Sequence, residues 1–265
     1  MLKTAPFRSG KVSFNDTGKG RAVVLIHGFL GAHQIWENTI KDLSKSYRVI
    51  AIDLPGHGAT GCFGYVHSME LLAKSVKAVM DHLRLSRYVL IGHSMGGYAA
   101  LAFADLFPDN ICGICLYHST AYPDSEDKKR DRVRSAKVVK ANHHIYTREV
   151  INNLFASKNI KYLKEEISFA NKIASKTPKQ GIIAALEGMK DRPDRSIILG
   201  LVQYPIMMVI GERDNVLPYQ QLLDQAEKIQ NKHVLYLEHD GHMGFLESPK
   251  RSNKELRKFL RKCFK

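Results

Sequence analysis

The sequence predicts an α/β fold, in which a doubly wound, mostly parallel β-sheet carries an inserted all-helical cap. Two patterns support this prediction. Short apolar runs alternate with longer segments of helical periodicity, and apolar runs without polar alternation are typical of strands buried on both faces, as in parallel sheets. Residues 119–201 interrupt this rhythm with helical patterns alone, and they are far too many for an ordinary connection.

Six apolar runs define the predicted parallel strands. They lie at residues 22–26, 47–52, 88–91, 111–117, 205–210 and 233–237. Helical patterns fall between them, at residues 33–45, 69–83, 95–107, 219–230 and 249–262. This alternation implies right-handed crossovers that place helices on both faces of the sheet. The first fifteen residues are expected to add an antiparallel hairpin at one edge.

The helical interruption divides the chain into two predicted domains. The α/β core consists of residues 1–118 and 202–265, and the cap consists of residues 119–201. Helices in the cap are expected at residues 126–141, 147–155, 160–174 and 178–190. Arg192-Pro193-Asp194 follows the last of them and ends it.

The positive charge of the chain is concentrated in two segments. The formal net charge is +14, and residues 119–200 and 249–265 each carry +7, so the remainder is neutral. Surface lysines on helices commonly serve solubility. The functional alternative is that the basic cap attracts an anionic substrate or an acidic carrier protein. Nucleic acid is not expected as a partner, because no aromatic–basic module accompanies the charge.

The sequence carries no signal for a membrane. No apolar run approaches the ~18 residues that span a bilayer, and the N-terminus lacks the apolar core of a signal peptide. These features predict a soluble cytoplasmic protein.

The cysteines do not indicate a metal site. Cys112 and Cys115 have C-x-x-C spacing, but they lie in an apolar run without a second pair of cysteines. A free cysteine in such a run behaves as a small apolar residue, so we expect both to pack in the core. Neither a metal nor an organic cofactor is expected.

The strongest chemical signal is the motif G-H-S-M-G-G at residues 92–97. It directly follows the predicted strand 88–91 and opens the predicted helix 95–107. Glycines on either side of Ser94 allow a sharp strand-to-helix turn that exposes the serine Oγ. The helix start also directs free N–H groups toward the same place. Ser94 is therefore the predicted nucleophile.

A second motif suggests how an oxyanion would be stabilised. The residues H-G-F at 27–29 follow the first predicted parallel strand. A loop of small residues there can turn a backbone N–H toward the serine. The N–H groups of Phe29 and Met95 are the predicted oxyanion hole.

Two loops after the last strands supply the predicted general base and its carboxylate. His242 follows the last strand, and Asp214 follows the strand before it. A base at the carboxyl edge of the sheet can reach the Ser94 hydroxyl, and a carboxylate can hold its imidazole in the required tautomer. His239, three residues before His242, is the rival base.

Together these motifs resemble the α/β-hydrolase superfamily with a helical cap. The matching segments are H-G-F at 27–29, D-L-P-G-H-G at 53–58, the motif at 92–97, G-E-R-D at 211–214 and G-H at 241–242. They place serine, acid and histidine in the order that this family uses. Within the superfamily, the chain is similar to carboxylesterases, enol-lactonases and esterases acting on pimeloyl-carrier methyl esters. The segment 53–58 is interpreted as a structural turn.

The resemblance implies hydrolysis of a small or medium carboxylic ester through an acyl-enzyme on Ser94. Two alternatives stay open. Some relatives use the same triad for C–C bond hydrolysis or for a menaquinone-pathway elimination, with cap arginines holding carboxylates. The cap arginines here are Arg130, Arg132, Arg134, Arg148, Arg192 and Arg195. Other hydrolase-fold proteins are ligand receptors with slow hydrolysis. His118, at the end of its strand, is a candidate for the border of the substrate pocket.

Overall fold

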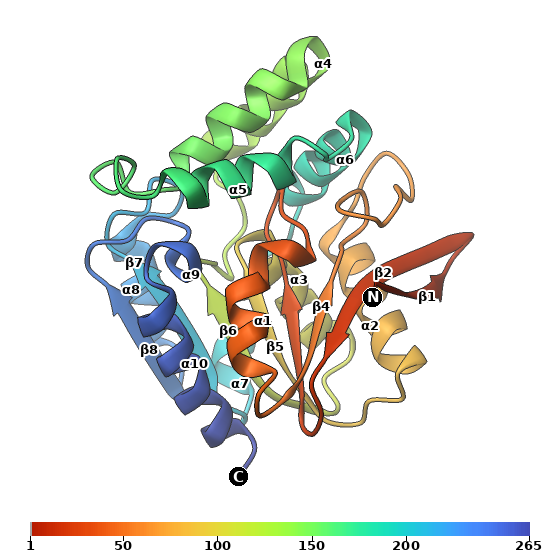
Figure 1. Cartoon of the computed structure of the whole chain (residues 1–265), viewed down its shortest axis with the longest axis vertical. Helices are drawn as coiled ribbons and strands as arrows, with labels where there is room; N and C mark the ends of the chain where they lie inside the picture. Colours follow the sequence, from red (N-terminus) through yellow and green to blue (C-terminus); the bar gives the residue numbers. More distant parts are fainter. Residues whose placement is uncertain (1) are drawn as a thin grey trace.

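A computed structural model describes residues 2–265, which contain one eight-stranded β-sheet (Figure 1). The strands are β1 (Lys3–Phe7), β2 (Gly10–Thr17), β3 (Ala22–Ile26), β4 (Arg48–Ile52), β5 (Tyr88–His93), β6 (Ile111–Tyr117), β7 (Ile206–Gly211) and β8 (Lys232–Leu237). Across the sheet their order is β1-β2-β4-β3-β5-β6-β7-β8. Strands β3 to β8 are parallel, and the antiparallel hairpin β1–β2 pairs with β4. The predicted mostly parallel sheet with a hairpin at its edge is confirmed.

Helices cover both faces of the sheet. They are η1 (His33–Trp36), α1 (Glu37–Leu43), α2 (Met69–His82), α3 (Met95–Leu106), α8 (Tyr219–Glu227), α9 (Gly244–Glu247) and α10 (Pro249–Cys263). Helices α1 and α10 pack together on one face, and α2 and α3 pack together on the other (Figure 1). This arrangement is the doubly wound one that the alternating pattern predicts.

The core lies between these two helix layers. Strands β3, β5, β6 and β7 are buried along their whole length, which explains why their sequences are continuous apolar runs. Each fully buried Ile or Leu side chain contributes roughly 1.5–3 kcal/mol. Cys112 and Cys115 are free thiols buried in β6, and Cys263 at the end of α10 is buried beside that strand.

The segment between β6 and β7 is helical. It contains α4 (Glu126–Asn153), α5 (Lys164–Ala174), α6 (Lys179–Lys190) and α7 (Ser196–Leu201), and α4 to α6 lie over one end of the sheet (Figure 1). Helix α4 is broken at Asn142, whose backbone is extended at φ −152° and ψ 91°. The predicted helices 126–141 and 147–155 correspond to its two halves. Helix α7 was not expected, because six residues are too short for a clear periodicity, and it packs against α3 of the core.

Close backbone contact and ion pairs attach these helices to the core. A Cβ on Gly181 or Gly188 of α6 would overlap the carbonyl oxygens of Gly56 and His67, so glycine permits the helix to approach the loop after β4. The buried guanidinium of Arg195 pairs with the carboxylates of Glu70 on α2 and Asp105 on α3.

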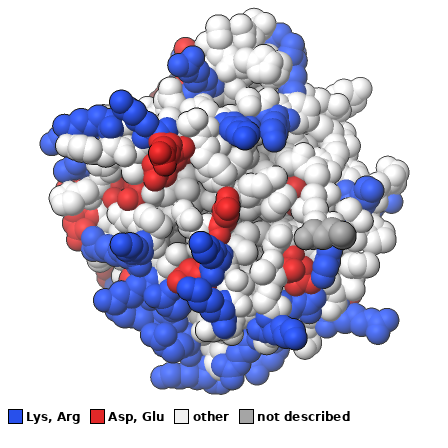
Figure 2. Space-filling view, in the orientation of Figure 1, with Lys and Arg blue, Asp and Glu red and all other residues white. Residues whose placement is uncertain are grey.

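The surface charge follows the pattern expected from the sequence. On the face drawn in Figure 2, Lys and Arg side chains gather around the end of the molecule where α10 terminates. Within residues 2–265, no helix combines the length and apolar character needed to cross a membrane.

Candidate active site

Ser94 occupies a strained turn between β5 and α3. Its backbone has φ 49° and ψ −117°, a conformation that non-glycine residues rarely adopt. A Cβ at Gly92 would overlap the backbone of Gly96, and one at Gly96 would overlap the carbonyl oxygen of Ile26. The turn is fixed by the Ser94 N–H, which donates to the Tyr117 carbonyl at 2.9 Å. The flanking glycines are therefore required by the close packing that holds Ser94 at the top of the sheet.

His242 and Asp214 form a buried pair beside this turn. The imidazole Nδ1–H of His242 donates to Oδ2 of Asp214 at 2.7 Å, and both side chains are almost fully buried. The N–H groups of Val216 and Leu217 donate to the other carboxylate oxygen, at 2.7 and 3.1 Å. Burial alone would raise the pKa of Asp214, but the charge and hydrogen bond of His242 lower it to about 2. Asp214 is thus a carboxylate held ready to orient His242.

The backbone of His242 is held by the helical segment as well as by the core. Its N–H donates to the Leu154 carbonyl at 2.7 Å, and its carbonyl accepts from Nε2–H of His93 at 2.9 Å. The ring atom Nε2 of His242 has no hydrogen-bond partner among residues 2–265, and His242 lines the same cavity as Ser94. This nitrogen is available to accept the serine proton.

The rival base lies elsewhere. His239 is exposed, lies 3.3 Å from the Arg213 guanidinium through Nδ1, and borders an outer groove that excludes Ser94. The geometry therefore favours His242 over His239.

The two predicted oxyanion donors have free N–H groups. In the described part of the chain, neither the Phe29 nor the Met95 N–H donates to another residue. The Gly28 carbonyl accepts from Nδ1–H of His27 at 2.7 Å and from the Gly31 N–H at 3.0 Å. Because the peptide is trans, fixing this carbonyl also fixes the following Phe29 N–H on the opposite side.

His118 is not on the border of the substrate cavity. It is fully buried, and it is absent from the residues that line the cavity next to Ser94. Its Nε2 accepts from the Gly244 N–H at 3.2 Å, which puts the proton on Nδ1, 3.8 Å from Oδ2 of Asp214. Burial lowers the pKa of His118 to about 3, so the ring is neutral. The side chain turns from the end of β6 toward Asp214, and substrate contact by His118 stays a prediction that this placement does not support.

The segment 53–58 has the structural role that the sequence suggests. The buried carboxylate of Asp53 accepts from the backbone of His33 at 2.7 Å and of Ala59 at 2.9 Å. A Cβ at Gly58, where φ is +55°, would overlap this carboxylate. The segment is a turn built around Asp53.

The cavity that contains Ser94 and His242 has a volume of about 190 Å³. Its apolar lining comes from both the core and the inserted helices, and consists of Phe29, Tyr98, Val150, Leu154, Leu186, Met189 and Val216. Its polar lining consists of His93, Ser94 and His242 from the core and of Lys128, Asp131, Arg132, Ser135 and Asn153 from α4. The volume suits a small organic substrate.

Only one of the six cap arginines borders this cavity. Arg132 does, and its Nε already donates to Asp124 at 2.9 Å. Arg192 donates to the same carboxylate at 2.6 Å and lies 4.0 Å above the Tyr98 ring, which makes it a structural residue. The other four lie elsewhere: Arg130 and Arg134 are exposed, Arg148 borders the outer groove and Arg195 holds the core.

Lys128 is the cavity residue that the sequence reasoning missed. It lies one turn before Arg132 on α4 and borders the cavity beside Ser94. The i, i+4 spacing to Arg132 was the available signal, but only the structure decides which face of α4 meets the cavity.

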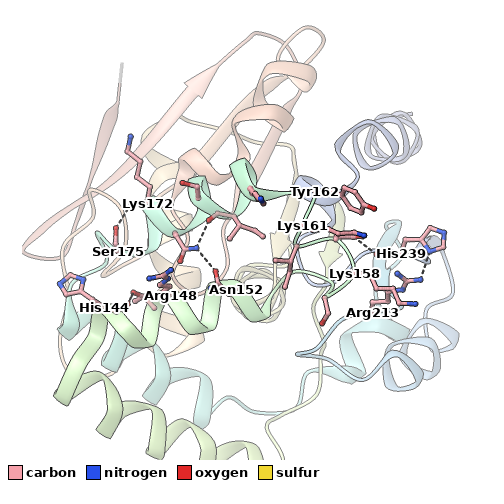
Figure 3. A pocket seen from close by; sticks show the side chains of 18 residues that line it. His144, Arg148, Asn152, Lys158, Lys161, Tyr162, Lys172, Ser175, Arg213 and His239 are labelled. Atoms are coloured by element: carbon pink, nitrogen blue, oxygen red, sulfur yellow. Dashed lines mark hydrogen bonds between the residues drawn. The ribbon is translucent and has the colours of Figure 1, made fainter.

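A larger groove of about 1370 Å³ lies on the outer side of the helical segment (Figure 3). It runs between α4, the loop 154–163 and α5, and reaches Arg213 and His239 of the core. Six Lys or Arg residues border it without any Asp or Glu: Arg148, Lys158, Lys161, Lys164, Lys172 and Arg213. None of Ser94, Asp214 and His242 borders it, so this groove is separate from the cavity beside Ser94.

Comparisons with known proteins agree with this architecture. The family model for the alpha/beta hydrolase fold matches residues 21–137. The structure superimposes on that of an esterase from Thermogutta terrifontis, solved with malate bound, with a TM-score of 0.94 and 30% identity, covering the whole of both chains.

Two curated relatives extend the comparison. One is a dihydrolipoyllysine-residue acetyltransferase component of an acetoin cleaving system from Pseudomonas putida, 28% identical over 92% of this chain. The chain spans only 64% of that relative's length. The other is a 2-hydroxy-6-oxononadienedioate/2-hydroxy-6-oxononatrienedioate hydrolase from Paraburkholderia phymatum, 26% identical over 94% of this chain and 91% of its own length. With the sheet order, the strained serine turn and these matches, the chain belongs to the α/β-hydrolase superfamily.

Proposed function

We propose that the protein hydrolyses carboxylic esters through an acyl-enzyme on Ser94. The observation that carries this proposal is the His242–Asp214 pair at 2.7 Å, whose free Nε2 belongs to the same cavity as a serine on a strand-to-helix turn. A nucleophile, a base and a carboxylate that orients the base are the parts that acyl transfer requires.

The proposed reaction has two halves. Ser94 Oγ attacks the ester carbonyl while Nε2 of His242 takes its proton, and the N–H groups of Phe29 and Met95 stabilise the oxyanion. His242 then protonates the departing alkoxide, which leaves an acyl-enzyme. Water, deprotonated by His242, attacks this acyl group, and the acid leaves as Ser94 recovers its proton.

Cavity size and similarity both support a small or medium ester. A volume of about 190 Å³ accommodates a short acyl chain, and Phe29, Leu186 and Met189 are among the apolar residues that line it. The relative that covers the whole chain at 30% identity is an esterase.

The C–C hydrolase alternative keeps one supporting observation, the similarity to a 2-hydroxy-6-oxononadienedioate/2-hydroxy-6-oxononatrienedioate hydrolase. The arrangement of arginines favours ester hydrolysis instead. Among the cap arginines of the described chain, only Arg132 borders the cavity, and its guanidinium is already paired with the Asp124 carboxylate. A ligand receptor with slow turnover would use the same residues, and its turnover in the esterase assay would be much slower.

An acidic carrier of the acyl group would be held by the basic outer groove (Figure 3). The six cationic side chains around that groove and the absence of carboxylates among its described lining residues support this partner class. This part of the proposal concerns delivery of the substrate and leaves the chemistry at Ser94 unchanged.

The experiment is an esterase assay with p-nitrophenyl esters from acetate to octanoate, on the natural protein and Ser94→Ala. We expect turnover that is fastest on the short chains and is abolished in the variant. A fluorophosphonate should add its mass to Ser94, and the Ser157→Ala variant, altered in the outer groove, should behave as the natural protein. No turnover dependent on Ser94 at any chain length would reject the esterase proposal.

A further inference from the structure

One wall of the catalytic cavity is charged, and helix α4 supplies it. Lys128, Arg132 and Ser135 follow one another at i, i+4 and i+7, so they share one face of the helix. All three border the cavity that contains Ser94 and His242. The inserted helix therefore brings cationic groups to the reacting centre.

The two cations on this face differ in their partners. The guanidinium of Arg132 is bound to Asp124, which also holds Arg192, at 2.9 and 2.6 Å. The ammonium of Lys128 has neither an ion pair nor a hydrogen bond among residues 2–265. Asp131, the carboxylate nearest to it in the cavity lining, is exposed and pairs with Arg134 at 3.3 Å.

In the described part of the chain, the Lys128 ammonium is partly buried as well as unpaired. Its side chain is half-buried at a cavity that is lined by apolar as well as polar residues. Burial lowers the pKa of Lys128, Arg132 lowers it further, and the carboxylates of Asp124, Asp131 and Asp214 act in the other direction. An ammonium that is partly removed from water and lacks a partner interacts strongly with an anion placed next to it.

We propose that Lys128 binds a negatively charged group of the substrate, and that the preferred substrates are half-esters of short dicarboxylic acids. The inference rests on the proposed esterase function and specifies its substrate class. One ammonium without a partner in the described chain matches a single negative charge, so a carboxylate fits better than a phosphate dianion. The apolar residues of the cavity lining would hold the methylene chain while the ester carbonyl lies at Ser94.

The experiment compares matched substrates with and without the charge. Monoethyl and diethyl esters of succinate, glutarate and adipate would be assayed in a pH-stat, and kcat/KM determined for each. The Lys128→Met variant keeps the length and apolar stem of the side chain and removes the ammonium. Lys137→Met is the matched control, because Lys137 is exposed on the same helix and lies outside the cavity.

We expect Lys128→Met to lower kcat/KM for the half-esters by about tenfold to a hundredfold, mainly through KM. The diesters should change by less than about twofold, and Lys137→Met should change neither class. Lys128→Arg, which keeps the charge, should recover a large part of the preference for half-esters. Unchanged thermal midpoints would show that the variants fold.

Two outcomes would overturn the inference while leaving the esterase function intact. The first is that Lys128→Met lowers kcat/KM equally for half-esters and for diesters. The second is that Lys137→Met reduces the preference for half-esters over diesters as much as Lys128→Met does. If neither ester class were hydrolysed and fluorophosphonate failed to label Ser94, the proposed function itself would fail. In that case calorimetry would still test whether Lys128 binds the carboxylate. It would compare the affinity of monoethyl glutarate for Ser94→Ala and for the Ser94→Ala, Lys128→Met double variant, and equal affinities would reject the role of Lys128.

Discussion

The catalytic cavity and the outer groove border different faces of the second half of α4. Tyr146 and Val150 face the cavity of about 190 Å³, whereas Thr147 and Arg148 face the groove of about 1370 Å³. The groove is the larger and more strongly charged of the two. The cavity is bordered by Ser94 and His242, the proposed nucleophile and base, and His242 is bound to Asp214. The proposed chemistry is therefore assigned to the smaller cavity, on the basis of buried groups with fixed partners and not of size or charge.

The largest difference between the cavity and the groove is expected in kcat/KM, from the variant His242→Ala. Removing the base should lower kcat/KM roughly 10⁵-fold or more, as loss of a triad base does elsewhere. Steady-state assays on a p-nitrophenyl ester would measure this, with Lys161→Ala in the groove as the control. A loss below about tenfold would assign the base to another residue.

The next effect concerns the carboxylate. Asp214→Asn should lower kcat roughly 10⁴-fold, because the amide cannot stabilise the imidazolium and can favour the wrong tautomer of His242. The variant keeps the side-chain volume, so the thermal midpoint separates a catalytic loss from an unfolded protein. Activity within about tenfold of the natural protein would remove Asp214 from the mechanism.

A third prediction concerns the arginine that lies under the cavity. Arg192→Met should destabilise the protein by about 3 kcal/mol, because it breaks a buried ion pair and the stacking on Tyr98. Arg130→Met, at an exposed ion pair, should have nearly no effect on stability. Urea unfolding would measure both. Equal stability of the two variants would contradict a structural role for Arg192.

The buried neutral histidines predict how stability depends on pH. Burial lowers the pKa of His57 and of His118 to about 3, whereas an unfolded chain binds these protons near pH 6.5. Between these values the unfolded state holds more protons, so stability is full above pH 6.5 and falls as the pH drops.

Each such histidine contributes a slope of about 1.4 kcal/mol per pH unit. Urea unfolding of the natural protein and of His57→Gln at pH 7, 6 and 5 would measure this slope. The slope of the unfolding free energy against pH should be smaller in the variant by the contribution of one histidine. Equal slopes in both proteins would show that His57 does not contribute.

The smallest effect is expected in the groove. Lys161→Ala and Lys164→Ala together should change kcat/KM for a neutral ester by less than about twofold, since exposed charges act weakly at a distance. With an anionic ester, the pair of substitutions should reduce the advantage seen at low salt. Stopped-rate assays at 20 and 500 mM salt would measure both. Equal salt dependence for neutral and anionic esters in the natural protein would remove the groove from substrate attraction.

The sequence was sufficient for features that local rules determine. The strands could be predicted because β3, β5, β6 and β7 are buried on both faces. Ser94 could be predicted as the nucleophile because a strand, two glycines and a helix must coincide at such a turn. The predicted sheet, including its edge hairpin, is confirmed. The division into residues 1–118 with 202–265 and residues 119–201 stays a prediction, as do the roles of the site residues.

Features that depend on contacts between distant segments could not be predicted. His118 follows its strand as expected, but its orientation is set by Gly244, which is far away in the sequence. Six cap arginines looked equivalent, and only folding assigns Arg192 to Asp124 and Arg195 to Glu70 and Asp105. Lys128 is a candidate for binding the substrate because the carboxylates near it are bound to other residues, which the sequence does not show. Charge is visible in a sequence, whereas the partner of a charge is not.

The hydrogen bond from the His242 N–H to the Leu154 carbonyl has a consequence for motion and for design. Leu154 follows α4, so the backbone of His242 is attached to the helical segment between β6 and β7 as well as to the core. Moving this end of the helical segment away from the sheet would break that hydrogen bond. A design that replaces the helical segment would have to retain the residues around Leu154 in order to keep this support for His242.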